Sequence, residues 1–471
     1  LGKDTCTLGK VRPEMEEELC RVLADFVRIM EGYRVDAYRA MASSAISEAA
    51  NSLYVLGKIR QLTGLSVTVL SNSEQRFLGY KALAAMEDNF NKIIEKGTAI
   101  LDLDGGSFQI SLFDKDALVT TQNIRMGSLR IRERLAGIQS ETEHYEEMVE
   151  ELIWNEVSSF KKMYLKDRKI ENIMLIGDVF TDSVYQNIEE KTTKIISREN
   201  FNTWYEKIIR QSPMELAVKL GIPLENASLM YPSAVIYKCL IDMMGAEHIW
   251  IPGVHMTRGI AYEYAEQMKL LKGGHNFEND ILMAAKNIGK RYAVNRPHVQ
   301  NLEMTALAMF DATKKMHGMK ERERLLLQMA VMLHDVGKYI SFNNVADSSY
   351  NIIMSNEIIG LSHIEREMVA LIARYNTVTL PSYDELVMES SLSAEQYLTV
   401  SELTAIVRLA NDRSHLQKIQ AIRATLKERE LQLSLTVNRD FTLEQGLCQE
   451  KLDFFNEVFS IQPVIKLKRQ M

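Results

Sequence analysis

The sequence predicts an α/β region followed by an all-helical region and a small terminal α+β unit. Strand-like and helix-like segments alternate up to about residue 270, a pattern typical of mixed α/β structure. From 280 to about 428 nearly every segment has the apolar spacing of a helix, and from about 431 the sequence LQLSLTV alternates like a strand. A polar, glycine-bearing stretch at 270–280 is typical of a linker. The expected parts are 1–95, 96–270, 280–428 and 429–471.

Composition narrows the class of protein. The 471 residues are 46% hydrophobic and 25% charged, which is ordinary for a globular chain. The net charge of −7 argues against a strongly basic nucleic-acid binder. The four cysteines lie far apart, as in a reduced cytosolic protein, and no apolar run reaches the roughly 18 residues that a membrane span needs. The polar first residues are unlike a signal peptide. We therefore expect a cytoplasmic protein that binds neither membrane nor nucleic acid.

Periodicity places the individual elements before residue 270. Apolar residues recur at helical spacing within several segments, as in EMEEELCRVLADFVRIME, whereas SVTVL and TAILDL are β-branched or continuously apolar, as in strands. The expected helices are 14–31, 43–61, 74–94, 128–136, 141–165, 212–220, 232–244 and 257–270. The expected strands are 35–41, 66–70, 98–103, 107–113, 117–122, 172–177 and 248–252.

A glycine-containing loop between two strands is the most informative short segment. It reads Asp102-Leu103-Asp104-Gly105-Gly106-Ser107. Two glycines let the backbone pass close to an anion and direct successive N–H groups at it, and Asp102 can orient a hydrated Mg²⁺ beside phosphates. We expect Asp102, Asp104, Gly105, Gly106 and Ser107 to bind phosphate. The alternative is a glycine hairpin without a ligand.

The segments around this loop resemble the Ppx/GppA family of exopolyphosphatases and guanosine pentaphosphate phosphohydrolases. Family motifs occur in the same order along the first 270 residues. The matching segments are Met41–Asn51, Val69–Arg76, Asp102–Gln109, Met126–Glu133, Ser228–Ala234 and Arg258-Gly259. The resemblance implies ribonuclease-H-like lobes of the sugar-kinase and actin type over the first 270 residues, with 96–270 as the second lobe.

The resemblance also implies an activity. It is the release of a terminal phosphate from polyphosphate or guanosine penta/tetraphosphate, with Mg²⁺ as cofactor and a homodimer as the assembly. Glu74 matches the family's glutamate, which acts as base on the attacking water, and Gln75 is the competing match. The alternative for Glu74 is a helix N-terminal carboxylate stabilised by the helix dipole.

Several positions depart from the family pattern. The chain begins at a segment that resembles the part of the family after its first phosphate loop, so the first lobe, 1–95, is expected to be incomplete. Ser47 stands where the family has arginine, Asp104 where it has a loop glycine, and Gly177–Thr181 where it has Gly-Gly-Thr. Each change weakens phosphate binding. A catalytically degenerate protein that binds polyphosphate or guanosine alarmones is therefore the alternative to an enzyme.

The helical region contains His334-Asp335 within Met332–Lys338, which resembles the signature of an HD-type domain. A His-Asp pair and an upstream histidine can bind one divalent metal. The resemblance implies His298 as that upstream ligand, and Asp412 is the substitute for a late aspartate.

Other positions of the HD pattern have lost their ligands. Val345 and Ser348 stand where relatives have histidines, Asn411 where they have the late aspartate, and Asn376 in place of the histidine of Arg-Tyr-His. We therefore expect weak or absent metal in this region. Its expected role is to form part of the substrate channel and the dimer contact.

Overall fold

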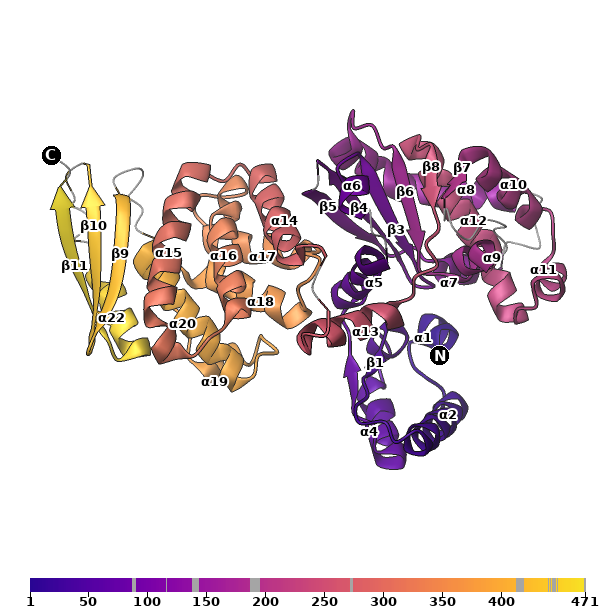
Figure 1. The fold of residues 1–471 in the computed structure, drawn as a ribbon, viewed down its shortest axis with the longest axis horizontal. Helices are drawn as coiled ribbons and strands as arrows, with labels where there is room; N and C mark the ends of the chain where they lie inside the picture. The colour runs from indigo at the N-terminus through magenta and orange to yellow at the C-terminus, as the bar shows by residue number, and fades with distance from the viewer. Residues whose placement is uncertain are drawn as a thin grey trace. The chain divides into compact units, whose positions relative to one another are not determined.

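The computed structural model divides into two compact units, Leu1–Asn276 and Phe277–Met471 (Figure 1). The boundary falls within the polar stretch 270–280 that the sequence predicts as a linker. The structure describes all residues except 87–89, 116, 138–143, 187–194, 272–273, 412–418, 439, 441, 443–445, 447 and 470–471.

The first unit opens with a small lobe around a two-stranded parallel sheet. Its elements are α1 (Gly2–Leu8), α2 (Pro13–Gly32), β1 (Ala40–Ala42), α3 (Ser44–Ser47), α4 (Ser52–Thr63) and β2 (Val67–Val69). Strand β1 pairs with β2 in parallel, with Ala40 opposite Val67. Helices α2 and α4 enclose a separate apolar core that includes Cys20, Val55 and Ile59.

Two expected elements of this lobe differ in extent. The strand expected at 35–41 is only β1, because the residues before Ala40 have no neighbouring strand among the described residues. The helix expected at 43–61 is broken into α3 and α4. Asn51 lies at this break, where its side-chain amide donates to the carbonyl of Val11 over 2.8 Å and its side-chain oxygen accepts from the N–H of Val11 over 2.9 Å. An asparagine that satisfies another segment's backbone favours a break rather than a helix interior.

The larger lobe is built on a six-stranded sheet in the order β5-β4-β3-β6-β8-β7. The strands are β3 (Thr98–Leu103), β4 (Phe108–Asp114), β5 (Ala117–Ile124), β6 (Asn172–Ile176), β7 (Ile195–Ser197) and β8 (His248–Trp250). Strand β3 is antiparallel to β4 and parallel to β6, so it lies where the sheet changes from an antiparallel to a parallel part. Its residues Ala99, Leu101 and Leu103 are buried in the main core.

Helices cover this sheet. They are α5 (Asn72–Met86), α6 (Phe90–Ile94), α7 (Ser128–Leu135), α8 (Tyr145–Phe160) with a π-helical end (Lys161–Leu165), α9 (Val179–Gln186), α10 (Arg198–Ile209), α11 (Pro213–Leu220), α12 (Leu224–Met244) and α13 (Met256–Gln267). The sequence analysis expects this helix to start at residue 232. The helix instead begins at Leu224 and runs through Pro232, whose ring is buried in the core.

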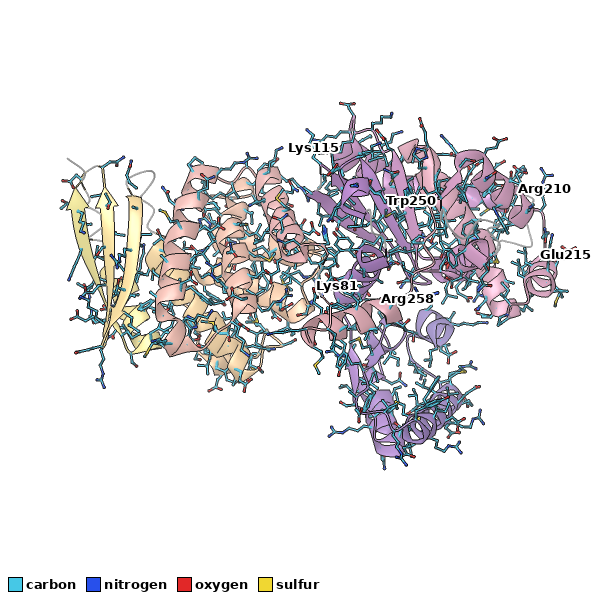
Figure 2. All side chains as sticks on the ribbon, viewed as in Figure 1. Lys81, Lys115, Arg210, Glu215, Trp250 and Arg258 are labelled. Carbon is cyan, nitrogen blue, oxygen red and sulfur yellow. The ribbon has the colours of Figure 1, made fainter. Side chains whose placement is uncertain are left out.

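Helix α5 packs on the larger lobe, although its residues precede the expected lobe boundary at 95. The ring of Tyr80 lies 5.5 Å from that of Phe113 in β4, centroid to centroid. Lys81 donates to Glu263 of α13 over 3.0 Å (Figure 2). A Cβ atom on Gly259 of α13 would lie 1.9 Å from the carbonyl oxygen of Leu78, so only glycine permits this close approach. Helix α13 and strand β4 therefore hold α5 against the larger lobe.

The second unit is helical with a terminal sheet. Its helices are α14 (Phe277–Arg291), α15 (Arg296–His317), α16 (Glu321–Leu333), the 3₁₀ turn η3 (Val336–Tyr339), α17 (Val345–Ser355), α18 (His363–Tyr375), α19 (Tyr383–Leu386) and α20 (Ala394–Ala410). The terminal elements are β9 (Ile419–Lys427), β10 (Glu430–Val437), α22 (Gln449–Phe459) and β11 (Gln462–Arg469), with strand order β11-β10-β9. Strand β9 begins before the boundary expected at 429. Among the described residues, no helix is long and apolar enough to cross a membrane.

Candidate functional site

The glycine loop connects the end of β3 to the start of β4 and is held by the first turn of α7. Ser128 donates its N–H to the carbonyl of Asp104 over 3.2 Å, and Arg130 donates its N–H to the carbonyl of Gly105 over 3.0 Å. A Cβ atom on Gly127 would lie 2.3 Å from the Asp104 oxygen, so a side chain there would push the loop away. The loop is therefore rigidly placed before any ligand arrives.

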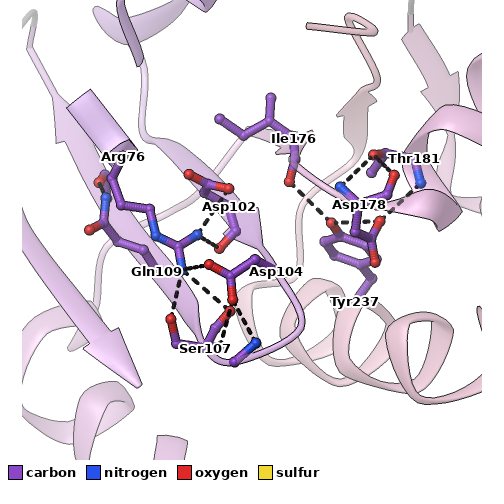
Figure 3. Close-up of polar contacts among 11 residues, drawn as sticks. Arg76, Asp102, Asp104, Ser107, Gln109, Ile176, Asp178, Thr181 and Tyr237 are labelled. Carbon is purple, nitrogen blue, oxygen red and sulfur yellow. Dashed lines mark hydrogen bonds and ion pairs between the residues drawn. The ribbon is translucent and has the colours of Figure 1, made fainter. Parts of the chain in front are cut away.

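The side chain of Asp104 turns back onto the backbone of the loop. Its Oδ1 accepts from the N–H of Gly106 over 2.7 Å and from the N–H of Ser107 over 2.8 Å (Figure 3). These are N–H groups that the sequence predicted to face a phosphate. The protein's own carboxylate satisfies them in this structure.

Arg76 of α5 contacts several residues of the loop. Its guanidinium lies 2.9 Å from Asp102 Oδ1 and 3.0 Å from Asp104 Oδ2, and it also donates to Ser107 Oγ over 2.8 Å (Figure 3). The arginine is buried. Burial lowers the pKa of Arg76, but the attraction of Asp102 and Asp104 outweighs it, so the guanidinium is held charged.

A second polar group lies at the end of the neighbouring strand β6. Asp178 Oδ1 accepts from the N–H of Thr181 over 3.1 Å and from the hydroxyl of Tyr237 over 3.4 Å (Figure 3). Its Oδ2 is buried and has no hydrogen-bond partner in the part of the chain that the structure describes. Burial raises the pKa of Asp178 to about 6. Gly177, with φ of 106°, brings this segment against Asp102.

A cavity of about 180 Å³ opens on the loop from the small lobe. Arg130 lies at it, donating to the carbonyl of Gly106 over 3.0 Å and pairing with Glu48 over 3.3 Å. Glu48 comes from the small lobe and Arg130 from α7, so this ion pair links the two lobes of the first unit. The lining residues are Gly2, Thr5, Cys6, Ser43, Ser44, Ala45, Glu48, Gln75, Asp104, Gly105, Gly106, Leu129 and Arg130.

Glu74 is not among the residues that line this cavity. Its Oε2 accepts from the N–H of Ser71 over 2.9 Å and from its hydroxyl over 2.7 Å, which is the contact of a helix cap at the start of α5. Gln75, the competing match, does line the cavity, and its Oε1 is buried without a hydrogen-bond partner in the described part of the chain. Both cap contacts use Oε2 of Glu74, so its other oxygen does not take part in the cap.

Sequence reasoning missed Arg76, Arg130, Asp178 and Tyr237 as site residues. Arg76 and Arg130 both stand inside motifs that carry the family resemblance, so their positions gave a signal. Asp178 stood in the segment noted only as degenerate. Tyr237 gave none, because a tyrosine in an apolar helix is usually part of the core.

In the second unit, His298, His334 and Asp335 converge as the sequence predicted. Their ligand atoms all lie within 4.8 Å of one another. His334 Nδ1 donates to the carbonyl of Val331 over 2.7 Å, and its Nε2 lies 3.4 Å from Asp335 Oδ2. Asp412, the fourth expected ligand, lies outside the described residues.

Two asparagines fill the neighbouring ligand positions of the HD pattern. Asn411 donates its amide to Asn376 Oδ1 over 2.7 Å, so its own oxygen accepts from His298 Nε2 over 3.0 Å. Lys338 hydrogen-bonds to Asp335. Burial raises the pKa of Asp335, but His334 and Lys338 outweigh it, and its pKa lies below the usual range. The protein's own groups thus satisfy two of the three candidate ligands.

Comparison with known proteins agrees with this architecture. Residues 1–268 match the model of the Ppx/GppA phosphatase family, and residues 282–454 match the model of Ppx/GppA phosphatase domain III. The chain therefore belongs to the Ppx/GppA phosphatase family, whose members are phosphoanhydride hydrolases. The HD-type assignment of the helical unit stays a prediction.

Individual relatives are distant. The guanosine-5'-triphosphate,3'-diphosphate pyrophosphatase of Photobacterium profundum is 20% identical over 402 residues, covering 84% of this chain and 77% of the relative. The protein of the same name from Vibrio atlanticus is 18% identical, covering 78% and 72%. A crystal structure of an exopolyphosphatase from Cytophaga hutchinsonii has a TM-score of 0.49 at 16% identity, covering 58% of this chain and 88% of that one.

Proposed function

We propose that this chain hydrolyses the terminal phosphoanhydride bond of inorganic polyphosphate or of guanosine pentaphosphate. The observation that carries the proposal is the loop Asp102–Ser107, fixed at the end of β3 beside a cavity that also holds Arg130. Phosphoryl transfer needs positioning and electrostatic stabilisation more than covalent chemistry from the protein. A rigid loop of backbone N–H groups with two arginines nearby supplies those elements.

The cavity and its charges suit the end of a polyanion. Arg130 is partly exposed at the cavity, and within the described part of the chain its ion pair is with an exposed carboxylate, Glu48. A terminal phosphate can replace Glu48 as its partner, because arginine binds phosphate in a bidentate manner. Both proposed substrates present such a phosphate, so the cavity accounts for the class of substrate and leaves the choice between them to experiment.

In the proposed step, the oxygen of a water bonds to the terminal phosphorus while the bond to the bridging oxygen breaks. The proton passes to a carboxylate, and the shortened chain leaves with the bridging oxygen. Glu74 is the proposed base, through the oxygen that does not take part in its contacts with Ser71. Glu74 does not line the cavity, so its proposed role as base rests on its match to the family's glutamate within Val69–Arg76 and on that unused oxygen.

Magnesium fits this loop through a single protein oxygen. Arg76 holds Oδ1 of Asp102, and the oxygens of Asp104 are bound by Arg76, Gly106 and Ser107. Asp102 Oδ2 is the remaining carboxylate oxygen of the loop. Mg²⁺ usually binds through one or two carboxylates, several waters and substrate phosphates, so Asp102 is the residue proposed to hold it. When bound, the ion neutralises the charge of the phosphate oxygens.

The test is release of orthophosphate by the full chain with Mg²⁺, from polyphosphate and from guanosine pentaphosphate in parallel. Release from either one supports the proposal, and the ratio of the two values of kcat/KM assigns the substrate. If the chain only binds these anions, it will release no phosphate from either one and will still bind them measurably.

A further inference from the structure

We propose that Asp104 is a resident anion that sets the affinity of the loop, so that a terminal phosphate enters only when this carboxylate leaves. The inference rests on the proposed function in one respect, that phosphate is the natural occupant of the loop. It concerns binding, which can be measured without turnover. In this proposal, the Asp104 carboxylate determines the affinity of the loop for phosphate.

The geometry places the Asp104 carboxylate where a phosphate oxygen would lie. Oδ1 of Asp104 accepts hydrogen bonds from two successive backbone N–H groups, that of Gly106 over 2.7 Å and that of Ser107 over 2.8 Å. Successive backbone N–H groups of this kind form the concave anion sites that bind phosphates in other proteins. An aspartate often accepts from the N–H two residues ahead, as in an Asx turn. Here that ordinary contact consumes the donors on which anion binding depends.

The second carboxylate oxygen is also held. Oδ2 of Asp104 lies 3.0 Å from the guanidinium of Arg76, which is only 2% exposed. A buried charged hydrogen bond of this kind is short and strong compared with a neutral one. To vacate the loop, Asp104 therefore has to give up contacts with a cation and with two N–H groups together. An incoming phosphate has to replace all of them.

The charge of the loop opposes a second anion. Arg76 is the cation beneath the loop, and it faces the two carboxylates of Asp102 and Asp104. Arg130 at the same loop is paired with Glu48, so the two carboxylates that face Arg76 leave the loop with net negative charge before a phosphate arrives, and like charges in a poorly solvated site repel strongly. Without the Asp104 carboxylate, Arg76 and Asp102 would balance, and the two N–H groups would be open.

The experiment measures binding of inorganic orthophosphate to the full chain by calorimetry at constant ionic strength. Asp104→Ala removes the carboxylate and is expected to bind phosphate at least about tenfold more tightly than the wild type. Asp104→Asn keeps an oxygen for the N–H groups but removes the charge, and is expected to gain less than Asp104→Ala. Asp25→Ala, which removes an exposed carboxylate of α2, is the matched control and is expected to bind like the wild type.

A thermal readout separates this role from a merely structural one. Loss of the Asp104 contacts is expected to lower the Tm of Asp104→Ala, and phosphate is expected to restore it, because a ligand that binds the folded state stabilises it. A folded Asp104→Ala that binds phosphate no better than the wild type would overturn the proposal. An equal gain in Asp104→Asn and Asp104→Ala would overturn occupancy of the N–H groups as the cause.

A second variant protects the test from a folding failure. Asp104→Gly places at this position the residue of the family pattern and serves if Asp104→Ala does not fold. Tighter phosphate binding without any hydrolysis by the variants or the wild type would support this inference and contradict the proposed function. Hydrolysis by the wild type, with no gain of phosphate affinity in Asp104→Ala or Asp104→Gly, would support the proposed function and contradict this inference.

Discussion

Arg76 reaches from α5 to within 3.0 Å of Asp104 Oδ2 and is 2% exposed, so a buried cation joins the helix to the glycine loop. The same guanidinium contacts Asp102. Removing it leaves two carboxylates close together without a counter-charge, which is among the most destabilising changes to a buried network. We expect Arg76→Ala to lower the free energy of unfolding by about 3–5 kcal/mol, measured by urea denaturation.

The matched control for Arg76 is an arginine in an exposed ion pair. Arg21 lies 3.8 Å from Glu18 on α2, and both side chains are largely exposed. Arg21→Ala is expected to change stability by less than about 1 kcal/mol. A loss of similar size in the two variants would contradict the assignment of Arg76 as the charge that holds the loop.

Glu74 is expected to serve both as a helix cap and as the base. Glutamine also completes a capping box, so Glu74→Gln should keep the Tm while turnover falls by about two to four orders of magnitude. Ser71→Ala is the control, since it removes the hydroxyl of the cap but leaves the carboxylate. It should lower the Tm and largely keep turnover. Full turnover in Glu74→Gln would show that this residue is a cap and nothing more.

Asp178 should make stability depend on pH with a defined sign. Its folded pKa of about 6 exceeds the ordinary value of 3.8, so the folded state binds an extra proton between these values and loses stability as pH rises through them. Asp178→Asn removes this cost. It should raise the free energy of unfolding by at most about 3 kcal/mol at pH 7.5 and have little effect near pH 4.

Asp242 provides a control of opposite sign. Burial raises its pKa, but contacts with Lys238 and Arg198 outweigh it, and the pKa is lowered overall. Its stabilisation is present at neutral pH, so Asp242→Asn should lower the Tm at pH 7.5. If Asp178→Asn also lowers the Tm at pH 7.5, the ionised carboxylate of Asp178 does not lower the stability of the wild type at that pH.

The helical unit should bind metal only weakly. His298 and Asn376 are joined through Asn411 in a chain of hydrogen bonds that needs no ion. Asn411→Asp supplies the carboxylate of the HD pattern and should raise the affinity for Mn²⁺ or Zn²⁺ at least about tenfold, measured by calorimetry. Adding His334→Ala should abolish the gain. Stoichiometric metal in the purified wild type, lost on His334→Ala, would contradict this reading.

The central strands were predictable because a buried strand is a continuous apolar run and a half-buried strand alternates apolar and polar residues. The apolar run at 98–103 is β3 with the bounds that the sequence predicts, and alternation in LQLSLTV became β10, with Leu431, Leu433 and Leu435 buried. The start of α12 was not predictable, because a proline can be accommodated inside a long buried helix when the core compensates for its missing hydrogen bond. Helices α9 and α10 were not predicted.

The sequence predicts where the glycine loop lies in the fold, but not how its side chains are directed. The order of motifs located the loop Asp102–Ser107, and the histidine cluster converged as expected. No sequence pattern shows the direction of a side chain, so the hydrogen bonds that the Asp104 carboxylate accepts from the loop's own N–H groups could not be predicted. The contact of Arg76 with the loop joins residues far apart in sequence and depends on the packing of α5 over β3.

The proposed hydrolysis of a phosphoanhydride bond at the loop that ends β3 can be measured directly. Release of orthophosphate from polyphosphate and from guanosine pentaphosphate is compared for the wild type and Asp102→Asn at equal folded concentration. We expect Mg²⁺-dependent release by the wild type and a loss of about two orders of magnitude or more in Asp102→Asn. Absence of release from both substrates, or equal release by the two proteins, would contradict it.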